Sequence, residues 1–218
     1  MLSAIVPALN ASGTLAASLA ALSDADEIVV VDGGSSDATA AIAERSGARV
    51  VRTARGRGAQ LQSGVLAARG DWLLFLHADT VLERGWREAA DGHIAAGAGR
   101  AAFFRFRLGA DNWQARLVEA GAALRVGLLK LPFGDQGLLV SRALYETVGG
   151  YRSLPLLEDV DLVRRIGRAR LLALPVEAVT SAERWQRDGW LRRSARNLLY
   201  LALYRLGVPA ARIAELYD

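Results

Sequence analysis

The chain has 218 residues, of which 52% are hydrophobic and 23% charged, a composition that excludes a disordered protein. It has no cysteine, which excludes disulfides, thiolate zinc sites and cysteine nucleophiles, and its two histidines are too few for a polyhistidine metal site. The formal net charge is +4, and an excess of this size does not predict nucleic-acid binding.

The first third of the chain alternates strand and helix patterns. Apolar or β-branched runs predict strands, and helical spacing after a capping residue predicts helices. The strands are expected at 4–6, 27–31, 49–51 and 71–77, and the helices at 12–22, 36–45 and 59–68. Wholly apolar strands separated by helices are typical of a parallel sheet covered on both faces. We therefore expect an α/β fold with a mostly parallel, nucleotide-binding sheet.

The rest of the chain is less regular. Helices are predicted at 86–96, 113–131, 142–148, 157–168 and 190–206, and strands at 100–108, 137–140 and 171–174. No repeat or linker interrupts this order, which favours one catalytic domain over 1–189 and a helical C-terminal extension over 190–218. The start of the chain lacks a signal-peptide pattern and no segment is long and apolar enough to span a membrane, so we expect a cytoplasmic protein.

Four predicted strands end in polar or small residues, at 7–10, 32–35, 53–58 and 77–79. Ordinary turn chemistry explains each of these segments when it is taken alone. In an open α/β sheet, however, ligands bind beyond the carboxyl ends of the strands, and one cleft would collect all four. The four strand ends together therefore predict a ligand site.

Two acidic segments are candidates for metal binding or catalysis. Asp79 follows the predicted strand 71–77, where a carboxylate can bind Mg²⁺ or Mn²⁺ or can cap the next helix together with Thr80. Glu158, Asp159 and Asp161 fall in the first turn of a predicted helix. Acids there offset the helix dipole, and one of them can also act as a general base.

Other nucleotide and hydrolase motifs fit the chain poorly. Gly56 and Gly58 begin a G-x-G-x-x-G pattern, but Leu61 stands in place of its third glycine. Neither the P-loop pattern nor G-x-S-x-G is present. The sequence therefore disfavours a P-loop nucleotidase and a serine hydrolase.

Four segments resemble motifs of the inverting family 2 glycosyltransferases, in the same chain order. Residues 3–10 resemble the opening strand and 27–37 the nucleotide turn. Residues 70–79 resemble the strand with the D-x-D metal motif, and 157–161 the E-D catalytic motif. The resemblance extends over at least 2–190. It implies the A-type, Rossmann-like glycosyltransferase fold, with a nucleotide-sugar half over 1–80 and an acceptor half over 81–189. It also implies a nucleotide-diphosphate sugar donor, a hydroxyl acceptor, and Mn²⁺ or Mg²⁺ as cofactor.

The same resemblance implies roles for individual residues. Nucleotide binding would involve Pro7, Asn10, Asp32, Gly33, Arg57, His77, Ala78 and Asp79, with Asp79 as the metal ligand. Asp159 would be the catalytic base, with Glu158 beside it. Acceptor binding would involve Gly134, Asp135, Gln136, Arg184 and Trp185. Two positions depart from the family pattern, because Gly33 and His77 stand where the nucleotide turn and the D-x-D motif each carry an acid.

Segments around Gly134 and Arg184 resemble a bacterial subgroup of small, non-processive members. The Q-x-x-R-W motif of processive polysaccharide synthases is incomplete, because Ser181 stands in place of its glutamine. The helix predicted at 190–206 mixes leucines with arginines. It would either lie on an anionic membrane, which would suit a lipid-linked acceptor, or pack on the domain.

Two other functions stay open at this point. A sugar-nucleotide nucleotidyltransferase shares the α/β core, but it normally has a basic, glycine-rich loop after the first strand, whereas residues 7–14 hold no basic residue. A catalytically inactive nucleotide-sugar-binding module would explain the departures at Gly33 and His77. The retention of Asp79, Glu158 and Asp159 favours an enzyme.

Overall fold

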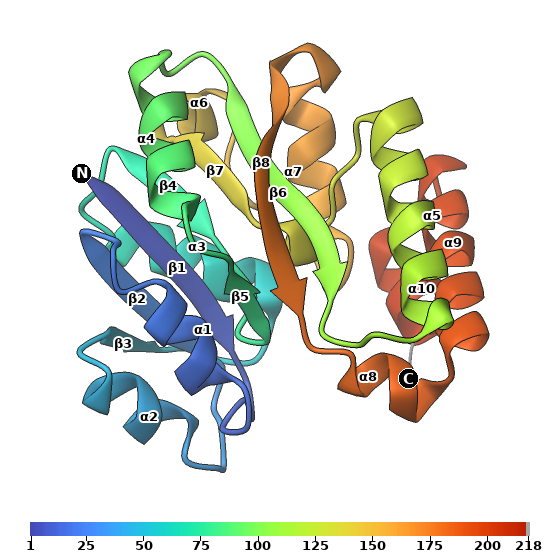
Figure 1. Cartoon of the computed structure of the whole chain (residues 1–218), viewed down its shortest axis with the longest axis horizontal. Helices are drawn as coiled ribbons and strands as arrows, with labels where there is room; N and C mark the ends of the chain where they lie inside the picture. The colour runs from blue at the N-terminus through green and yellow to red at the C-terminus, as the bar shows by residue number, and fades with distance from the viewer. Residues whose placement is uncertain (217–218) are drawn as a thin grey trace.

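The computed structural model describes residues 1–216 and has a central sheet with helices on both faces (Figure 1). Its described strands follow the order β3-β2-β1-β4-β7-β6-β8-β5 across the sheet. The strands are β1 (Leu2–Ala8), β2 (Glu27–Asp32), β3 (Arg49–Arg52), β4 (Trp72–Phe75), β5 (Thr80–Leu82), β6 (Ala101–Leu108), β7 (Leu138–Ser141) and β8 (Leu171–Thr180). The expected α/β class is confirmed.

The sheet is parallel in its first half and mixed in its second. β1 pairs in parallel with β2 and β4, and β2 with β3. β7 enters antiparallel to β4 and to β6, β8 runs parallel to β6, and β5 runs antiparallel to β8. The first four strands therefore direct their carboxyl ends to one edge of the sheet, where ligands bind in open α/β folds.

Two buried clusters divide the helices between the faces of the sheet. One cluster joins α1 (Leu15–Ala21), α2 (Thr39–Arg45) and α4 (Trp86–Ala95) to the sheet. The other joins α3 (Arg57–Ala67), α6 (Arg142–Thr147) and α7 (Glu158–Ile166) to the opposite face. Alternate residues of one strand serve the two clusters, as Val30 and Val31 of β2 do. This two-sided burial explains why the strands are wholly apolar.

The remaining helices stand beyond the far part of the sheet (Figure 1). They are α5 (Trp113–Leu129), α8 (Glu183–Asp188), α9 (Trp190–Arg205) and α10 (Ala210–Glu215), and two short 3₁₀ turns, η1 (Gly134–Gln136) and η2 (Arg168–Arg170), complete the chain. A small third cluster of Leu108, Ala115 and Trp185 ties α5 and α8 to β6.

The structure differs from the sequence-based expectation in several elements. β8 continues to Thr180 instead of ending near Leu174, because a register shift opposite Phe103 and Arg105 lets the strand pass Pro175, which has no N–H to donate. Asp79 and Thr80 do not cap a helix, since Thr80 begins β5 and α4 starts only at Trp86. The short helices α8 and α10 were not predicted.

Candidate active site

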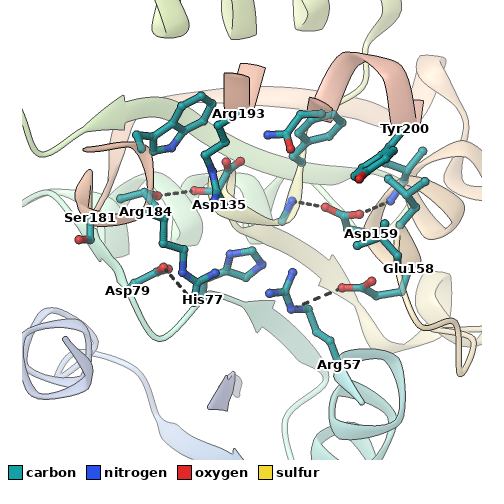
Figure 2. A pocket seen from close by; sticks show the side chains of 18 residues that line it. Arg57, His77, Asp79, Asp135, Glu158, Asp159, Ser181, Arg184, Arg193 and Tyr200 are labelled. Carbon is teal, nitrogen blue, oxygen red and sulfur yellow. Dashed lines mark hydrogen bonds and ion pairs between the residues drawn. The ribbon is translucent and has the colours of Figure 1, made fainter. Parts of the chain in front are cut away.

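A cavity opens beyond the end of β4 and is bounded by η1, the start of α7 and the helices α8 and α9. Figure 2 shows charged side chains converging on it from these elements. Its lining includes Arg57, His77, Asp79, Asp135, Glu158, Asp159, Ser181, Arg184, Arg193 and Tyr200. Acids and arginines from distant parts of the sequence therefore meet in one place.

Asp159 lies in the first turn of α7 with both carboxylate oxygens fixed. Oδ2 accepts a hydrogen bond from the N–H of Gly134 at 2.6 Å, and Oδ1 accepts one from the N–H of Val160 at 2.7 Å. Leu157, just before the helix, has the left-handed backbone conformation (φ 62°) that turns the chain into α7. Backbone donors stabilise a carboxylate charge. Asp159 is thus held in a defined position on the cavity wall.

Gly134 is the point of contact between the end of β4 and the start of α7. A Cβ atom at this position would lie 2.6 Å from Nε2 of His77 and 3.3 Å from Oδ2 of Asp159. The first distance is shorter than real Cβ contacts, so a side chain would displace the imidazole. Glycine therefore allows His77 and Asp159 to lie on either side of the same backbone segment.

Glu158, next to Asp159, is buried and faces Arg57. Its Oε1 lies 3.7 Å from Nε of Arg57. Burial, followed by the charge of Asp159, raises the pKa of Glu158 to about 7, and Arg57 opposes this rise. The start of α3, which carries Arg57, packs closely on the segment before α7, since a Cβ at Gly58 would overlap the carbonyl oxygen of Arg152. Glu158 is therefore a carboxyl group that stays partly protonated near neutral pH.

Asp79 and His77 lie where β4 has ended. Oδ2 of Asp79 is 3.8 Å from a guanidinium nitrogen of Arg184 in α8. Burial, followed by the charge of Arg57, lowers the pKa of His77 to about 4, so its imidazole is neutral at pH 7. Among residues 1–216, no three His, Cys, Asp or Glu side chains cluster in a way that could hold a metal ion. Asp79 is the carboxylate at this strand end that could hold a metal ion.

Asp135 approaches the cavity from η1. Its Oδ1 is buried and has no hydrogen-bond partner within the described part of the chain. Burial raises the pKa of Asp135 to about 6, against the opposing charge of Arg125. An unpaired buried carboxylate oxygen is costly, and at the wall of a cavity it can be satisfied by a ligand donor.

Gln136, expected beside Asp135 at the acceptor, points away from the cavity and is buried. Its amide donates to the carbonyl of Phe104 at 3.1 Å, and its Oε1 accepts from Arg125 at 3.2 Å and from the N–H of Phe133 at 3.3 Å. Gln136 thus holds η1 against β6. These hydrogen bonds keep the backbone beside Asp135 in place.

The expected nucleoside-binding residues form a second group, at the ends of β1 and β2. The carboxylate of Asp32 accepts from the hydroxyl of Ser35 at 2.5 Å, and Oδ1 of Asn10 accepts from the N–H of Ser36 at 2.9 Å. Gly33 lies against the side-chain amide of Gln60, which donates to the carbonyls of Ala8 in β1 and Val31 in β2. Pro7 lies in β1, whereas Ala78 follows β4, and like the others both lie outside the cavity lining.

The cavity-lining residues that were not expected include three from α9, Arg193, Asn197 and Tyr200. Their spacing of four and three places them on one face of the helix, and this regularity was the available signal. Trp185, an expected acceptor residue, stacks on Trp190 with ring centroids 6.1 Å apart, and Arg193 lies over the Trp185 ring. These contacts fix α8 and α9 against the cavity.

The fold is that of the A-type glycosyltransferases. Residues 3–137 match the family described as glycosyl transferase family 2, and because this match spans more than half of the chain, the protein belongs to that family. Uncharacterized glycosyltransferases of Mycobacterium bovis and Mycobacterium tuberculosis are 39% identical over 82 residues, which is 37% of this chain. The match spans only 38% of the length of these relatives.

Two solved structures illustrate the similarity of fold. Glucosyl-3-phosphoglycerate synthase from Mycobacterium tuberculosis, in complex with Mn²⁺, UDP and glucosyl-3-phosphoglycerate, aligns with 96% of this chain and 81% of its own at a TM-score of 0.63 and 24% identity. A mannosyltransferase from Pyrobaculum calidifontis, in complex with GDP-mannose and Mn²⁺, aligns with 94% of this chain and 64% of its own at a TM-score of 0.72 and 20% identity.

Proposed function

We propose that this protein transfers a sugar from a nucleotide-diphosphate donor to a hydroxyl group of an acceptor, in one inverting displacement and without processivity. The observation that carries the proposal is the position of Asp159. Its carboxylate is fixed by two backbone N–H groups on the wall of the cavity that Asp79 also lines. A base and a phosphate-side carboxylate in one cavity suit an inverting transfer in a family 2 glycosyltransferase.

The proposed reaction needs one base and no covalent intermediate. The acceptor oxygen attacks the anomeric carbon while the bond from that carbon to the diphosphate oxygen breaks, and Asp159 takes the hydroxyl proton. The diphosphate leaves with the electron pair of the broken bond. Asp135, whose Oδ1 is buried at the cavity wall, would orient the acceptor through one of its other hydroxyl groups.

Asp79 would hold Mn²⁺ or Mg²⁺ together with the donor. Mg²⁺ in proteins typically takes one or two carboxylates plus substrate phosphates, and a single strand-end carboxylate fits that pattern. When bound, such a cation would offset the negative charge that develops on the leaving diphosphate. Arg57 lines the same cavity and would add fixed positive charge for the phosphates. Arg184 was expected at the acceptor, but it lies 3.8 Å from Oδ2 of Asp79 and would add to this charge. The Mn²⁺ complexes with UDP or GDP-mannose of structurally similar enzymes support this assignment.

Two alternatives remain distinguishable by experiment. A nucleotidyltransferase would make a sugar nucleotide from a sugar phosphate and a nucleoside triphosphate, whereas an inactive module would bind the donor and leave it intact. The absence of any basic residue from 7 to 14 disfavours the first. The fixed geometry of Asp159 disfavours the second.

A thermal-shift screen of UDP, GDP, ADP and dTDP, with Mn²⁺ or with EDTA, tests the donor and metal roles. Asp79→Ala should lose the metal-dependent shift, and Asp71→Ala, which removes an exposed carboxylate before β4, is the matched control. Hydrolysis of the corresponding sugar nucleotide should follow, with the anomeric configuration of a transfer product read by NMR. Binding that ignores both EDTA and Asp79→Ala would refute the metal role, and a retained configuration would refute inversion.

A further inference from the structure

The outward face of α5 is apolar along most of its length. Trp113, Leu117, Leu124 and Leu128 are each between 55% and 68% exposed, and their spacing of four, seven and four residues places them along one stripe. Every exposed residue of α5 from Leu117 to Leu128 is leucine, alanine or glycine. The opposite side of the helix packs on the protein through Ala115 and Ala122.

Helix α9 has two faces with different roles. One face lines the cavity with Arg193, Asn197 and Tyr200. On the other side, Leu191, Leu198, Leu199 and Leu206, the last directly after the helix, are between 54% and 82% exposed. Figure 1 shows α5 and α9 side by side at the end of the molecule away from β3. Single exposed leucines are ordinary, but this many on two adjacent helices mark an interaction surface.

The exposed charges on α9 and directly after it, between Trp190 and Ile213, are all positive. Arg192 and Arg205 are exposed on α9, and Arg212 is exposed on α10. The sequence has no acidic residue between Gly189 and Ala214. An anionic surface would complement these arginines, whereas a second copy docking through α9 would bring arginines against arginines. The charge pattern therefore favours anionic lipid over self-association.

We propose that α5 and α9 together dock the protein on the surface of an anionic lipid bilayer, with the leucines entering the interfacial region and the arginines contacting lipid phosphates. No helix within 1–216 is long and apolar enough to cross a membrane, so the proposed contact is with the surface. The cavity lies on one side of α9 and the docking face on the other. Docking would therefore place the cavity one helix away from the bilayer, near acceptors held there. That last consequence rests on the proposed function, whereas docking itself does not.

Flotation with vesicles of phosphatidylcholine, with or without roughly 30 mol% phosphatidylglycerol, tests the docking. We expect the intact chain to float with the anionic vesicles. Leu124→Gln/Leu128→Gln and Leu198→Gln/Leu199→Gln should each lower the partition coefficient at least about tenfold. Arg192→Gln/Arg205→Gln should weaken binding to anionic vesicles and reduce its salt dependence.

Leu66→Gln is the matched control, because Leu66 is 87% exposed on α3, on another part of the surface. It should float like the unmodified chain. Failure of the unmodified chain to float, or equal loss in Leu66→Gln, would overturn the proposal. A dimer in sedimentation velocity that the leucine variants disrupt, without flotation, would overturn it in favour of self-association. Cooperative thermal unfolding of the same variants confirms their folding, and their nucleotide-diphosphate binding with Mn²⁺ is a separate test of the proposed function.

Discussion

Polar residues gather both in the turns after β1 and β2 and in the cavity beyond β4, but their hydrogen bonding differs between the two regions. In the turns the groups satisfy one another, as Asp32 does with Ser35 and Asn10 with Ser36. In the cavity, Asp135 has a buried oxygen without a partner in the described chain, and Glu158 has a raised pKa. Charge held at such a cost is typical of functional sites. The comparison supports the proposal that the chemistry takes place in the cavity and that the turns hold the strand ends beside it.

The strongest test of this comparison is Asp159→Asn. The amide keeps the size of the side chain but removes the proposed base, so turnover should fall about 10² to 10⁴-fold. Binding of the nucleotide diphosphate with Mn²⁺ should change little, because Asp159 acts on the acceptor. Steady-state kinetics and a binding titration measure the two effects. Unchanged turnover, or an equal loss of donor affinity, would contradict the assignment.

Gly134→Ala tests whether the cavity needs its close backbone contact. The new Cβ would meet the imidazole of His77 and crowd Asp159. We expect at least about a tenfold loss of turnover and a loss of about 1–3 kcal/mol in the free energy of unfolding. Gly92→Ala in α4, where a Cβ meets nothing within 4 Å, is the control and should gain about 0.5–1 kcal/mol. Similar behaviour of the two variants would show that the contact at Gly134 is unimportant.

The same division appears in what the sequence could predict. The elements from β1 to β4 follow local patterns, apolar runs and helical spacing, and the expected elements are confirmed there. β5 has three residues and exists through its pairing with β8, so no local pattern marks it. β8 passes Pro175 only because of an irregularity in its pairing with β6. Both β5 and the length of β8 depend on pairing between strands that are distant in the sequence, which local sequence patterns do not predict.

The candidate site shows a similar limit. Asp79, Glu158 and Asp159 stand at the ends of elements, where their types and the family resemblance point to chemistry. Arg193 reaches the cavity only because α9 folds back over it, and Gln136 turns beneath η1 only because Phe104 and Arg125 offer it partners. Residue type indicated a role, whereas side-chain direction depended on contacts between distant segments.

The variant Glu158→Gln tests the cost of burying this carboxyl group, through the pH dependence of the free energy of unfolding. The folded pKa of Glu158 is about 7, above the ordinary 4.5, so the unfolded chain releases this proton first. The stability owed to the neutral carboxyl is present below about pH 4.5 and is lost as pH rises to about 7. The variant should therefore gain about 1–3 kcal/mol of unfolding free energy relative to the native chain between these pH values. Denaturant unfolding across the range measures this, with the exposed Glu146→Gln as control; a difference that does not change with pH would contradict it.

Ser35→Ala should give the smallest effect and tests the other side of the comparison. The change removes the hydroxyl that donates to Asp32 and that accepts from the N–H of Asn10 at 2.9 Å. Because these groups are only partly buried, we expect a loss of about 1–2 kcal/mol in the free energy of unfolding. Ser36→Ala is the matched control, since its hydroxyl reaches Oδ1 of Asn10 only at 3.4 Å. Thermal unfolding of both variants measures this. If the hydrogen bonds of Ser35 stabilise the turn, Ser35→Ala must lower the free energy of unfolding more than Ser36→Ala does.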